Sequence, residues 1–277
     1  MYADPIVASG GFVAHVGPIE RLGSRAFGLV LEPHHLNFAG RFHGGMMLTL
    51  VRTACGEVAR DEALRARSGV MAELLSLDCS FVSAALEGAQ VRAEVDITRL
   101  TRTVAFLSTR VHAGDQVLAT ASSSFKIGVR QGGAPGPAGP EEPTTEGWSP
   151  MVTREPFAQR VAPVHERQDG AATKRAGFRV TPDRLDAHGR GVLHEGMSLF
   201  VADVFCGRAA VAASGSHCVT LGMQARRFGD APAGSWVEFE PRVRHVAPSV
   251  VFVDGSFTVQ DRIWLEVSSV WKVLGAT

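Results

Sequence analysis

The chain has 277 residues, of which 45% are hydrophobic and 20% are charged, and its 28 basic side chains equal its 28 acidic ones. This is a globular composition, and a net charge of zero excludes a strongly basic protein whose field gathers nucleic acid or anionic lipid. The first residues show no secretory signal pattern, and the longest apolar runs are too short to span a bilayer. We therefore expect a globular protein without nucleic-acid or membrane partners.

The first half predicts a short extended segment, a loop, one long helix and then strands. The helix begins at about Gly44 and reaches the region of Arg60, and its first three turns are apolar on nearly all sides, which indicates a buried helix. Beyond it the apolar residues alternate with period two, as in strands with one buried face. The predicted strands are 75–81, 91–97, 104–111 and 117–127, with a hairpin turn at 113–116.

A segment rich in Gly, Pro, Thr and Glu divides the chain near its middle. Residues 131–148 read Q-G-G-A-P-G-P-A-G-P-E-E-P-T-T-E-G-W and have no apolar periodicity, which is typical of a linker. The prediction is therefore an N-terminal unit at 1–130, a linker at 131–150 and a C-terminal unit at 151–277.

The second half repeats the first, which indicates an internal duplication. The segment P-H-H-L-N-F-A-G-R-F-H-G-G-M (33–46) has a counterpart two residues longer, P-D-R-L-D-A-H-G-R-G-V-L-H-E-G-M (182–197). The same element pattern follows it, with a helix expected at about 195–213. The expected strands are 219–228, 236–240, 250–259 and 263–273. We expect an α+β fold in which each unit wraps an antiparallel sheet of about five strands around one buried helix.

The four cysteines, Cys55, Cys79, Cys206 and Cys218, form no C-x-x-C pair. That spacing favours small buried hydrophobic residues over a zinc or redox motif, and it fits a reducing, cytoplasmic setting.

The pattern N-F-A-G-R-F-H-G-G (37–45) before an apolar helix resembles the PaaI-like, 4-hydroxybenzoyl-CoA thioesterase-type hotdog proteins. In that family an acidic residue stands nine positions after the His, and a Ser or Thr follows the acidic residue by about eighteen positions. The second half resembles this part, because D-V-F-C-G-R-A-A (203–210) precedes V-T-L-G-M-Q-A-R-R-F (219–228). The resemblance implies two tandem hotdog units that form a pseudodimer within one chain.

In this family each active site is shared between two protomers, so the matching residues decide how many sites survive. The resemblance implies one complete composite site, to which the first unit contributes Asn37, His43 and Gly44 and the second contributes Asp203 and Thr220. The opposite combination lacks these parts. Arg52 replaces the acid there, Glu195 replaces the first Gly after His194, Glu73 stands where Thr220 has its match, and Asp186 or His188 fills the Asn position.

Thioester hydrolysis needs a nucleophile or base and a donor for the developing oxyanion. Gly44 N–H, at a helix N-terminus, is expected to polarise the thioester carbonyl. Asp203 either attacks that carbonyl or activates a water, and both routes remain open. Asn37 would orient the carbonyl or the water, Thr220 would hydrogen-bond Asp203 or the water, and His43 would shape the loop and cap the helix.

The expected substrate is an acyl-CoA thioester, with no metal and no cofactor. Gly45 and Met47 are candidates to contact the acyl group, and the chain's further assembly into homo-oligomers stays open. Four arginines are candidates to meet the phosphates of coenzyme A: Arg99, Arg102, Arg226 and Arg227.

Three alternatives remain at this point. Asp203 could be a structural ion-pair partner of Arg52 across the helix interface. The protein could bind acyl-CoA or another acyl ligand without hydrolysing it. A hotdog dehydratase or hydratase is the third reading, but the His-Gly-Gly motif followed by an acid nine residues on does not match the motif of those enzymes.

Overall fold

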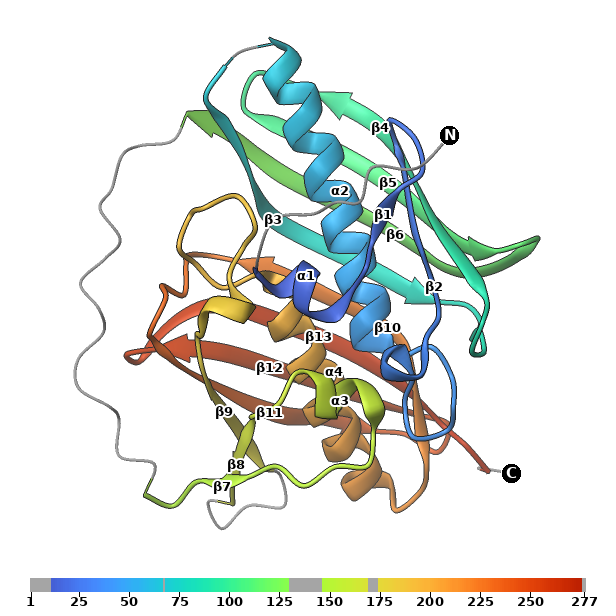
Figure 1. Ribbon diagram of the computed structural model, residues 1–277. Helices are drawn as coiled ribbons and strands as arrows, with labels where there is room; N and C mark the ends of the chain where they lie inside the picture. The colour runs from blue at the N-terminus through green and yellow to red at the C-terminus, as the bar shows by residue number, and fades with distance from the viewer. Residues whose placement is uncertain (1–10, 67, 130–145, 169–173, 276–277) are drawn as a thin grey trace.

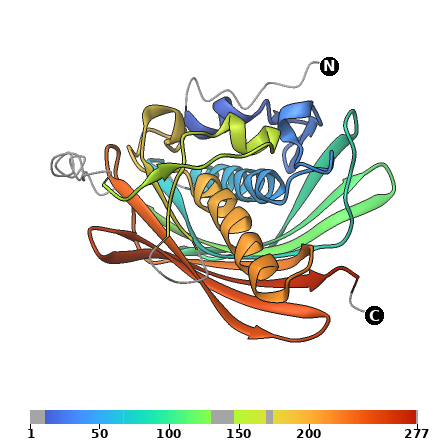
Figure 2. The same ribbon diagram turned by 90° about the horizontal axis from the view of Figure 1, so that it is seen from below.

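The structure is a computed structural model that describes residues 11–275 apart from 67, 130–145 and 169–173. Two long helices, α2 (Gly44–Ala66) and α4 (Glu195–Ser214), pack against each other on the concave face of one curved sheet (Figures 1 and 2). The fold predicted from the sequence, two tandem hotdog units in one chain, is therefore confirmed. Most of the predicted linker lies outside the described residues, and the unit limits stay a prediction.

All strands of the described residues belong to one antiparallel sheet, in which the two units are mirrored in order. The first unit's sheet ends in β3 (Val70–Phe81), which pairs with β10 (Cys218–Arg227) of the second unit and so joins the units. The remaining strands of the first unit are β1 (Glu20–Arg21), β2 (Ala26–Val30), β4 (Gln90–Leu100), β5 (Val104–Ala113) and β6 (Gln116–Val129). Those of the second unit are β7 (Ser149–Pro150), β8 (His165–Arg167), β9 (Arg175–Arg179), β11 (Trp236–Val246), β12 (Val250–Val259) and β13 (Arg262–Val273).

The long strands and both long helices lie where the sequence pattern predicts them. The predicted hairpin at 113–116 is also present, with Gly114 at φ 55° in its turn. The extended segment predicted before each loop is present as β2 and β9, but a short helix that the sequence analysis did not predict precedes it in each unit. α1 (Gly11–Val16) buries Phe12, Val13 and Val16, and α3 (Pro156–Arg160) buries Phe157 and Ala158, so helical spacing turns these apolar residues inward.

These two short helices cross from one unit to the other. α1 packs on the 3₁₀ turn η2 (Pro182–Arg184), where Phe12 N–H donates to Leu185 O at 2.9 Å. α3 packs in the same way on η1 (Pro33–His35), where Phe157 N–H donates to Leu36 O. Each loop that precedes a long helix is therefore covered by the opening helix of the other unit.

The core continues through both units and includes three of the cysteines, Cys55, Cys79 and Cys206, whereas Cys218 is half-buried. One helix of the described residues, α4, is long and apolar enough to cross a membrane by length and composition, and 72% of its apolar window is buried inside the fold.

One glycine in each unit sets how closely α2 and α4 approach. A Cβ on Gly45 would lie 2.7 Å from Phe200 Cα, and a Cβ on Gly196 would lie 2.8 Å from Thr49 Oγ1. Neither distance leaves room for a methyl group, so both units keep this glycine for packing.

We expect Gly45→Ala to lower the free energy of unfolding by about 1–3 kcal/mol, because the added methyl group forces the two helices apart. Gly128→Ala is the matched control, since a Cβ there meets nothing within 4 Å. Denaturant titration of both variants checks this, and equal stabilities would show that the helices do not cross at contact distance.

Candidate functional site: one composite position

Asp203 lies in the third turn of α4, beside the N-terminus of α2. Its side chain is 9% exposed, yet no cation of the described Lys and Arg residues pairs with it. Two donors reach it from opposite sides: Gly45 N–H at 3.0 Å from Oδ2 and Thr220 Oγ1 at 2.9 Å from Oδ1. The structure therefore brings Asp203 and Thr220 of the second unit together with the glycine loop of the first.

Gly44 begins α2 directly against the Asp203 carboxylate. A Cβ at this position would lie 2.7 Å from Asp203 Oδ2 and 2.9 Å from Oδ1, so any other residue would displace the carboxylate. The Gly44 N–H has no hydrogen-bond partner in the part of the chain that the structure describes, as expected for a first helical residue. A free N–H group at a helix N-terminus thus lies next to a buried carboxylate.

His43 connects the loop to both of these groups. Its Nδ1 accepts a hydrogen bond from Gly45 N–H at 2.9 Å and lies 3.5 Å from Asp203 Oδ2. Its Nε2 lies 3.4 Å from Oε2 of Glu155, which belongs to the second unit. The ring packs against Phe157 and Phe200. The predicted role of His43 in shaping the loop and capping the helix agrees with these contacts.

Asn37 lies at the start of the same loop, half-buried, with its side chain turned to its own backbone. Asn37 Oδ1 accepts hydrogen bonds from Ala39 N–H at 2.9 Å and from Arg41 N–H at 3.1 Å. No contact joins Asn37 to Asp203 within the described residues, so its orientation of the carbonyl or the water stays a prediction.

Burial is the largest influence on Asp203, and it raises the pKa of this carboxyl group above its usual value. Nearby His43, the Thr220 hydroxyl and the Gly45 N–H lower that pKa, whereas the charge of Glu155 raises it further. The net shift is upward, so once ionised Asp203 is a stronger base than an exposed aspartate.

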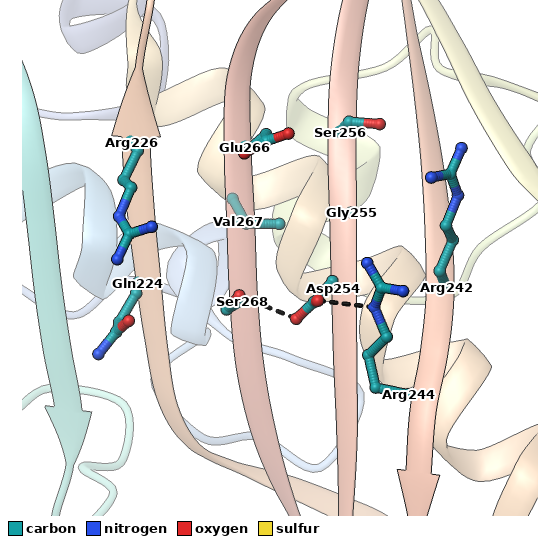
Figure 3. Close-up of a pocket in the computed structure, with 10 residues that line it drawn as sticks. All are labelled: Gln224, Arg226, Arg242, Arg244, Asp254, Gly255, Ser256, Glu266, Val267 and Ser268. Carbon is teal, nitrogen blue, oxygen red and sulfur yellow. Dashed lines mark hydrogen bonds and ion pairs between the residues drawn. The ribbon is translucent and has the colours of Figure 1, made fainter.

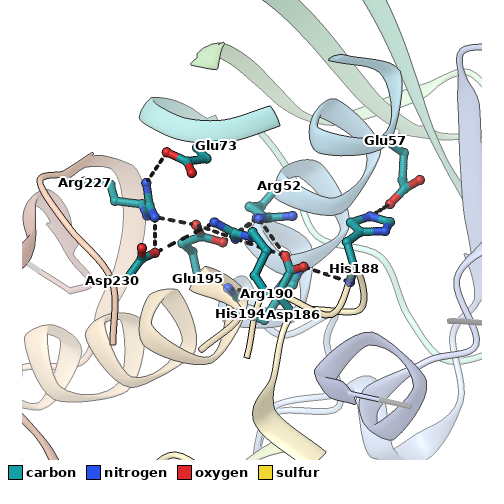
Figure 4. A network of polar contacts seen from close by, with 11 residues as sticks. Arg52, Glu57, Glu73, Asp186, His188, Arg190, His194, Glu195, Arg227 and Asp230 are labelled. Atoms are coloured by element: carbon teal, nitrogen blue, oxygen red, sulfur yellow. Dashed lines mark hydrogen bonds and ion pairs between the residues drawn. The ribbon is translucent and has the colours of Figure 1, made fainter. Parts of the chain in front are cut away.

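The opposite position of the pseudodimer is filled by ion pairs (Figure 4). Arg52, which occupies the place of Asp203, donates from Nε to Glu195 Oε2 at 2.7 Å and lies 3.4 Å from Asp186 Oδ2. Glu195 stands in the place of Gly44 and is fully buried. Arg190 and Arg227 approach the same carboxylates, at 3.2 Å from Asp186 and 3.3 Å from Glu195.

The electrostatics of this position are the reverse of those around Asp203. Burial alone would raise the pKa of Glu195, but Arg52, Arg190 and Arg227 outweigh it and hold that pKa at about 2. Burial, followed by the charge of Arg52, lowers the pKa of His194 to about 3. Glu195 is therefore a permanently charged internal partner of Arg52, and the alternative in which Arg52 pairs with Asp203 is wrong.

The structure also settles two correspondences between the units. Asp186 is the counterpart of Asn37, because Asp186 Oδ1 accepts from His188 N–H as Asn37 Oδ1 accepts from Ala39 N–H. The counterpart of Thr220 is Leu74 and not Glu73. Matching β-bulges, between Leu74 and Ser76 in one unit and between Thr220 and Gly222 in the other, show this.

The four arginines considered for the coenzyme A phosphates do not gather around Asp203. Arg226 lines a groove on the outer face of the sheet, together with Arg242 and Arg244 (Figure 3). Arg227 belongs to the ion-pair network of the second position, and Arg99 and Arg102 are exposed near the turn between β4 and β5. Their contact with phosphates stays a prediction.

Gly45 and Met47 follow Gly44 in the first turn of α2, and both contribute to the buried core or to the helix crossing. Their contact with an acyl group also stays a prediction. Among the described residues, no group of three or more His, Cys, Asp or Glu side chains is arranged to hold a metal ion.

Sequence reasoning missed two sets of residues. Glu155, beside His43, lies 112 residues away from it in sequence. Arg190 and Arg227 complete the ion-pair network. The shared Gly-Arg pair at 40–41 and 189–190 was a signal for Arg190, but nothing in the sequence indicated its partners.

We expect Arg52→Ala to lower the free energy of unfolding by about 3–5 kcal/mol, because Glu195 and Asp186 lose a buried counter-charge. Arg65→Ala is the matched control on the same helix. It removes an exposed ion pair with Glu62, so its free energy of unfolding should fall by less than about 1 kcal/mol. Urea titration measures both. The folded fraction of Arg52→Ala should retain the activity of the unmodified protein, and loss of activity in a stably folded variant would place Arg52 in the working site.

Comparisons with known proteins agree with this geometry. The model of the thioesterase superfamily matches residues 39–120, which include the His43-Gly44-Gly45 loop and α2. A search of curated protein sequences gives no significant match.

Solved structures are similar to the whole chain. A tesB protein of Mycobacterium avium subs paratuberculosis has 19% identity and a TM-score of 0.70, over 95% of this chain and 98% of that one. A protein of Alicyclobacillus acidocaldarius with a hot dog fold has 16% identity and a TM-score of 0.68, over 96% and 98%. Acyl-CoA thioesterase II TesB2 of Mycobacterium marinum has 14% identity and a TM-score of 0.61, over 94% and 96%.

At these identities the structures establish the fold, and the family model matches most of the first unit. The chain thus has a double-hotdog fold, and its residues 39–120 match the model of the thioesterase superfamily.

Proposed function

We propose that the protein is a thioesterase that hydrolyses an acyl-CoA, or a related acyl thioester, at one composite site. The observation that supports this most is the pairing of Gly44 and Asp203. A carboxylate that no described Lys or Arg pairs with lies against the N-terminus of a helix, and each comes from a different unit. The superfamily of the first unit points to thioester chemistry, and one structural neighbour is named an acyl-CoA thioesterase.

The parts of the proposed reaction match the groups at this position. The thioester carbonyl accepts a hydrogen bond from Gly44 N–H, whose helix dipole favours the negative charge of the tetrahedral intermediate. One preorganised donor of this kind contributes about 3–4 kcal/mol to the transition state. Asp203 then attacks the carbonyl carbon or removes a proton from the attacking water, and the thiolate of coenzyme A leaves.

Thr220 and Gly45 hold the two carboxylate oxygens of Asp203 in place. Each hydrogen bond to the ionised form lowers the pKa that burial has raised, so the carboxylate is kept ionised and still basic. At the second position Glu195 fills the space before its helix and Arg52 replaces the base. We therefore expect turnover at one position only.

The direct test is thiol release from acyl-CoAs of several chain lengths and from one aromatic acyl-CoA. Release with at least one of them supports hydrolysis. If no thiol appears but the same ligands raise the melting temperature, the protein is an acyl-CoA binding module. Thermal shift with and without each ligand therefore accompanies the assay.

We expect Asp203→Asn to abolish most of the hydrolysis, about a thousand-fold in kcat, because the amide is neither a base nor a nucleophile. The fold should keep or gain stability. A carboxyl whose folded pKa is raised stabilises the protein only at low pH, and this stability is lost as pH rises through that pKa. Thiol release and melting temperature at pH 7 measure both effects. Asp78→Asn, an exposed carboxyl on β3, is the control, and unchanged turnover in Asp203→Asn would refute the assignment.

We expect Thr220→Val to move the acidic limb of the pH–rate profile upward by about 1–2 pH units. The ionised form of Asp203 loses a hydrogen bond, and a bond to a charged group contributes about 1.5–3 kcal/mol. The dependence of kcat/KM on pH measures this shift. If the acidic limb of Thr220→Val lay at the same pH as that of the unmodified protein, the titrating group would not be Asp203.

A further inference from the structure

We propose that Glu155 is a positioning residue of this site: its carboxylate holds the His43 imidazole as the Nε2–H tautomer, and so fixes the Gly45 loop beside Asp203. This inference rests on the proposed thioesterase function. Glu155 was not recognised in the sequence, and it acts through His43 and not by contact with the substrate.

The placement of Glu155 is built into the second unit. It is the residue before α3, and Pro156 begins that helix, so the backbone of Glu155 is extended (φ −73°, ψ 121°). Glu155 N–H donates to Thr153 Oγ1 at 3.1 Å. The next residue but one, Phe157, is fully buried, and its ring lies 5.1 Å from His43 and 5.2 Å from Phe200. This anchor brings the carboxylate of one unit to the catalytic loop of the other.

The tautomer follows from the donors and acceptors around the ring. His43 is 4% exposed, so its ring nitrogens need partners within the protein. A backbone N–H can only donate, and Gly45 N–H at 2.9 Å therefore makes Nδ1 an acceptor. In the neutral ring the proton is then on Nε2, which faces Glu155 Oε2 at 3.4 Å. The same Gly45 N–H also donates to Asp203 Oδ2 at 3.0 Å, so it is shared and does not secure the tautomer alone. A carboxylate accepts the Nε2 proton and has none to give, so Glu155 adds the bond that selects one tautomer.

The second unit supplies the comparison. Gly196 N–H donates to His194 Nδ1 at 3.0 Å, and Phe12 stacks on His194 as Phe157 packs on His43. Yet His194 Nε2 is buried without a hydrogen-bond partner in the described residues, and Gly10 stands at the position equivalent to Glu155 in sequence. The loop forms without the acid, so the fold does not require Glu155. The acid occurs beside the position that also keeps Asp203.

The charge of Glu155 has a second consequence. Asp203 faces His43, Glu155, Cys79 and Cys206, and of these the Glu155 charge raises the pKa of Asp203. Burial raises the pKa of Glu155 itself, but His43 and Arg208 lower it overall, so Glu155 is ionised where Asp203 works. Removing this charge should lower the pKa of Asp203, the reverse of what Thr220→Val does.

Two substitutions separate the hydrogen bond from the charge. Glu155→Gln keeps an acceptor for Nε2–H, so most of kcat should remain while the acidic limb of the pH–rate profile moves to lower pH. Glu155→Ala removes both, and we expect kcat to fall about ten-fold or more, with KM within two-fold, because a small loss of alignment is costly. Glu94→Gln is the control. It removes the acid from another Glu–His pair, with His112, on an exposed part of β4.

The tautomer itself is read from side-chain ¹⁵N NMR of the substrate-free protein, with the His43 signal assigned by its loss in His43→Asn. In the unmodified protein and in Glu155→Gln we expect a single Nε2–H form of His43, and in Glu155→Ala a mixture of tautomers, with His194 unchanged in all three. The same His43 tautomer in Glu155→Ala, or an acidic limb that does not move in Glu155→Gln, would overturn the proposal. Absence of thiol release by the unmodified protein would refute the proposed function instead, and the NMR comparison would still decide what Glu155 does to His43.

Discussion

The close crossing of α2 and α4 is the constraint on which the rest of the structure depends. It is possible because Gly45 and Gly196 leave no side chain between the helices, where a Cβ would lie less than 3 Å from the other helix. The N-terminus of each long helix therefore lies beside the third turn of the other. This geometry produces two equivalent positions, each built from both units, before any residue suited to chemistry is placed in them.

The two positions solve the problem of buried charge in opposite ways. At the second, Glu195 is paired with Arg52 and approached by Arg190 and Arg227, so charge is compensated and the site is filled by its own side chains. At the first, the described residues give Asp203 hydrogen bonds from Gly45 and Thr220 and a nearby histidine but no Lys or Arg partner, and its pKa is raised. An ionised carboxylate is costly in such surroundings, and that cost is the expected property of a group kept for reaction.

Much of this could be predicted from the sequence because the duplication supplies its own control. The period-two strands and the two buried helices follow from spacing and from comparing the halves, whereas the pairing of Gly44 with Asp203 follows from the family resemblance. The short helices α1 and α3 could not be predicted, because their five or six residues fold against the other unit and not through their own propensity.

The direction in which some side chains point was the second feature that could not be predicted from the sequence. Arg226 and Arg227 are neighbours in β10, yet one points to the outer groove and the other into the ion-pair network, as alternation along a strand requires. Glu155 reaches His43 only because α3 packs on the loop of the first unit. Contacts of this kind depend on which elements of the two units meet, which no local pattern records.

The central claim is that two equivalent positions contain one working site. The most direct measurement is calorimetric titration of the protein with a non-hydrolysable thioether analogue of the acyl-CoA from which the assay detects thiol release. The structure predicts one binding site per chain, and predicts that Asp203→Asn changes its affinity while Arg52→Ala does not. Two sites of similar affinity per chain would contradict this, because the ion-pair network around Glu195 would then have to open for a ligand.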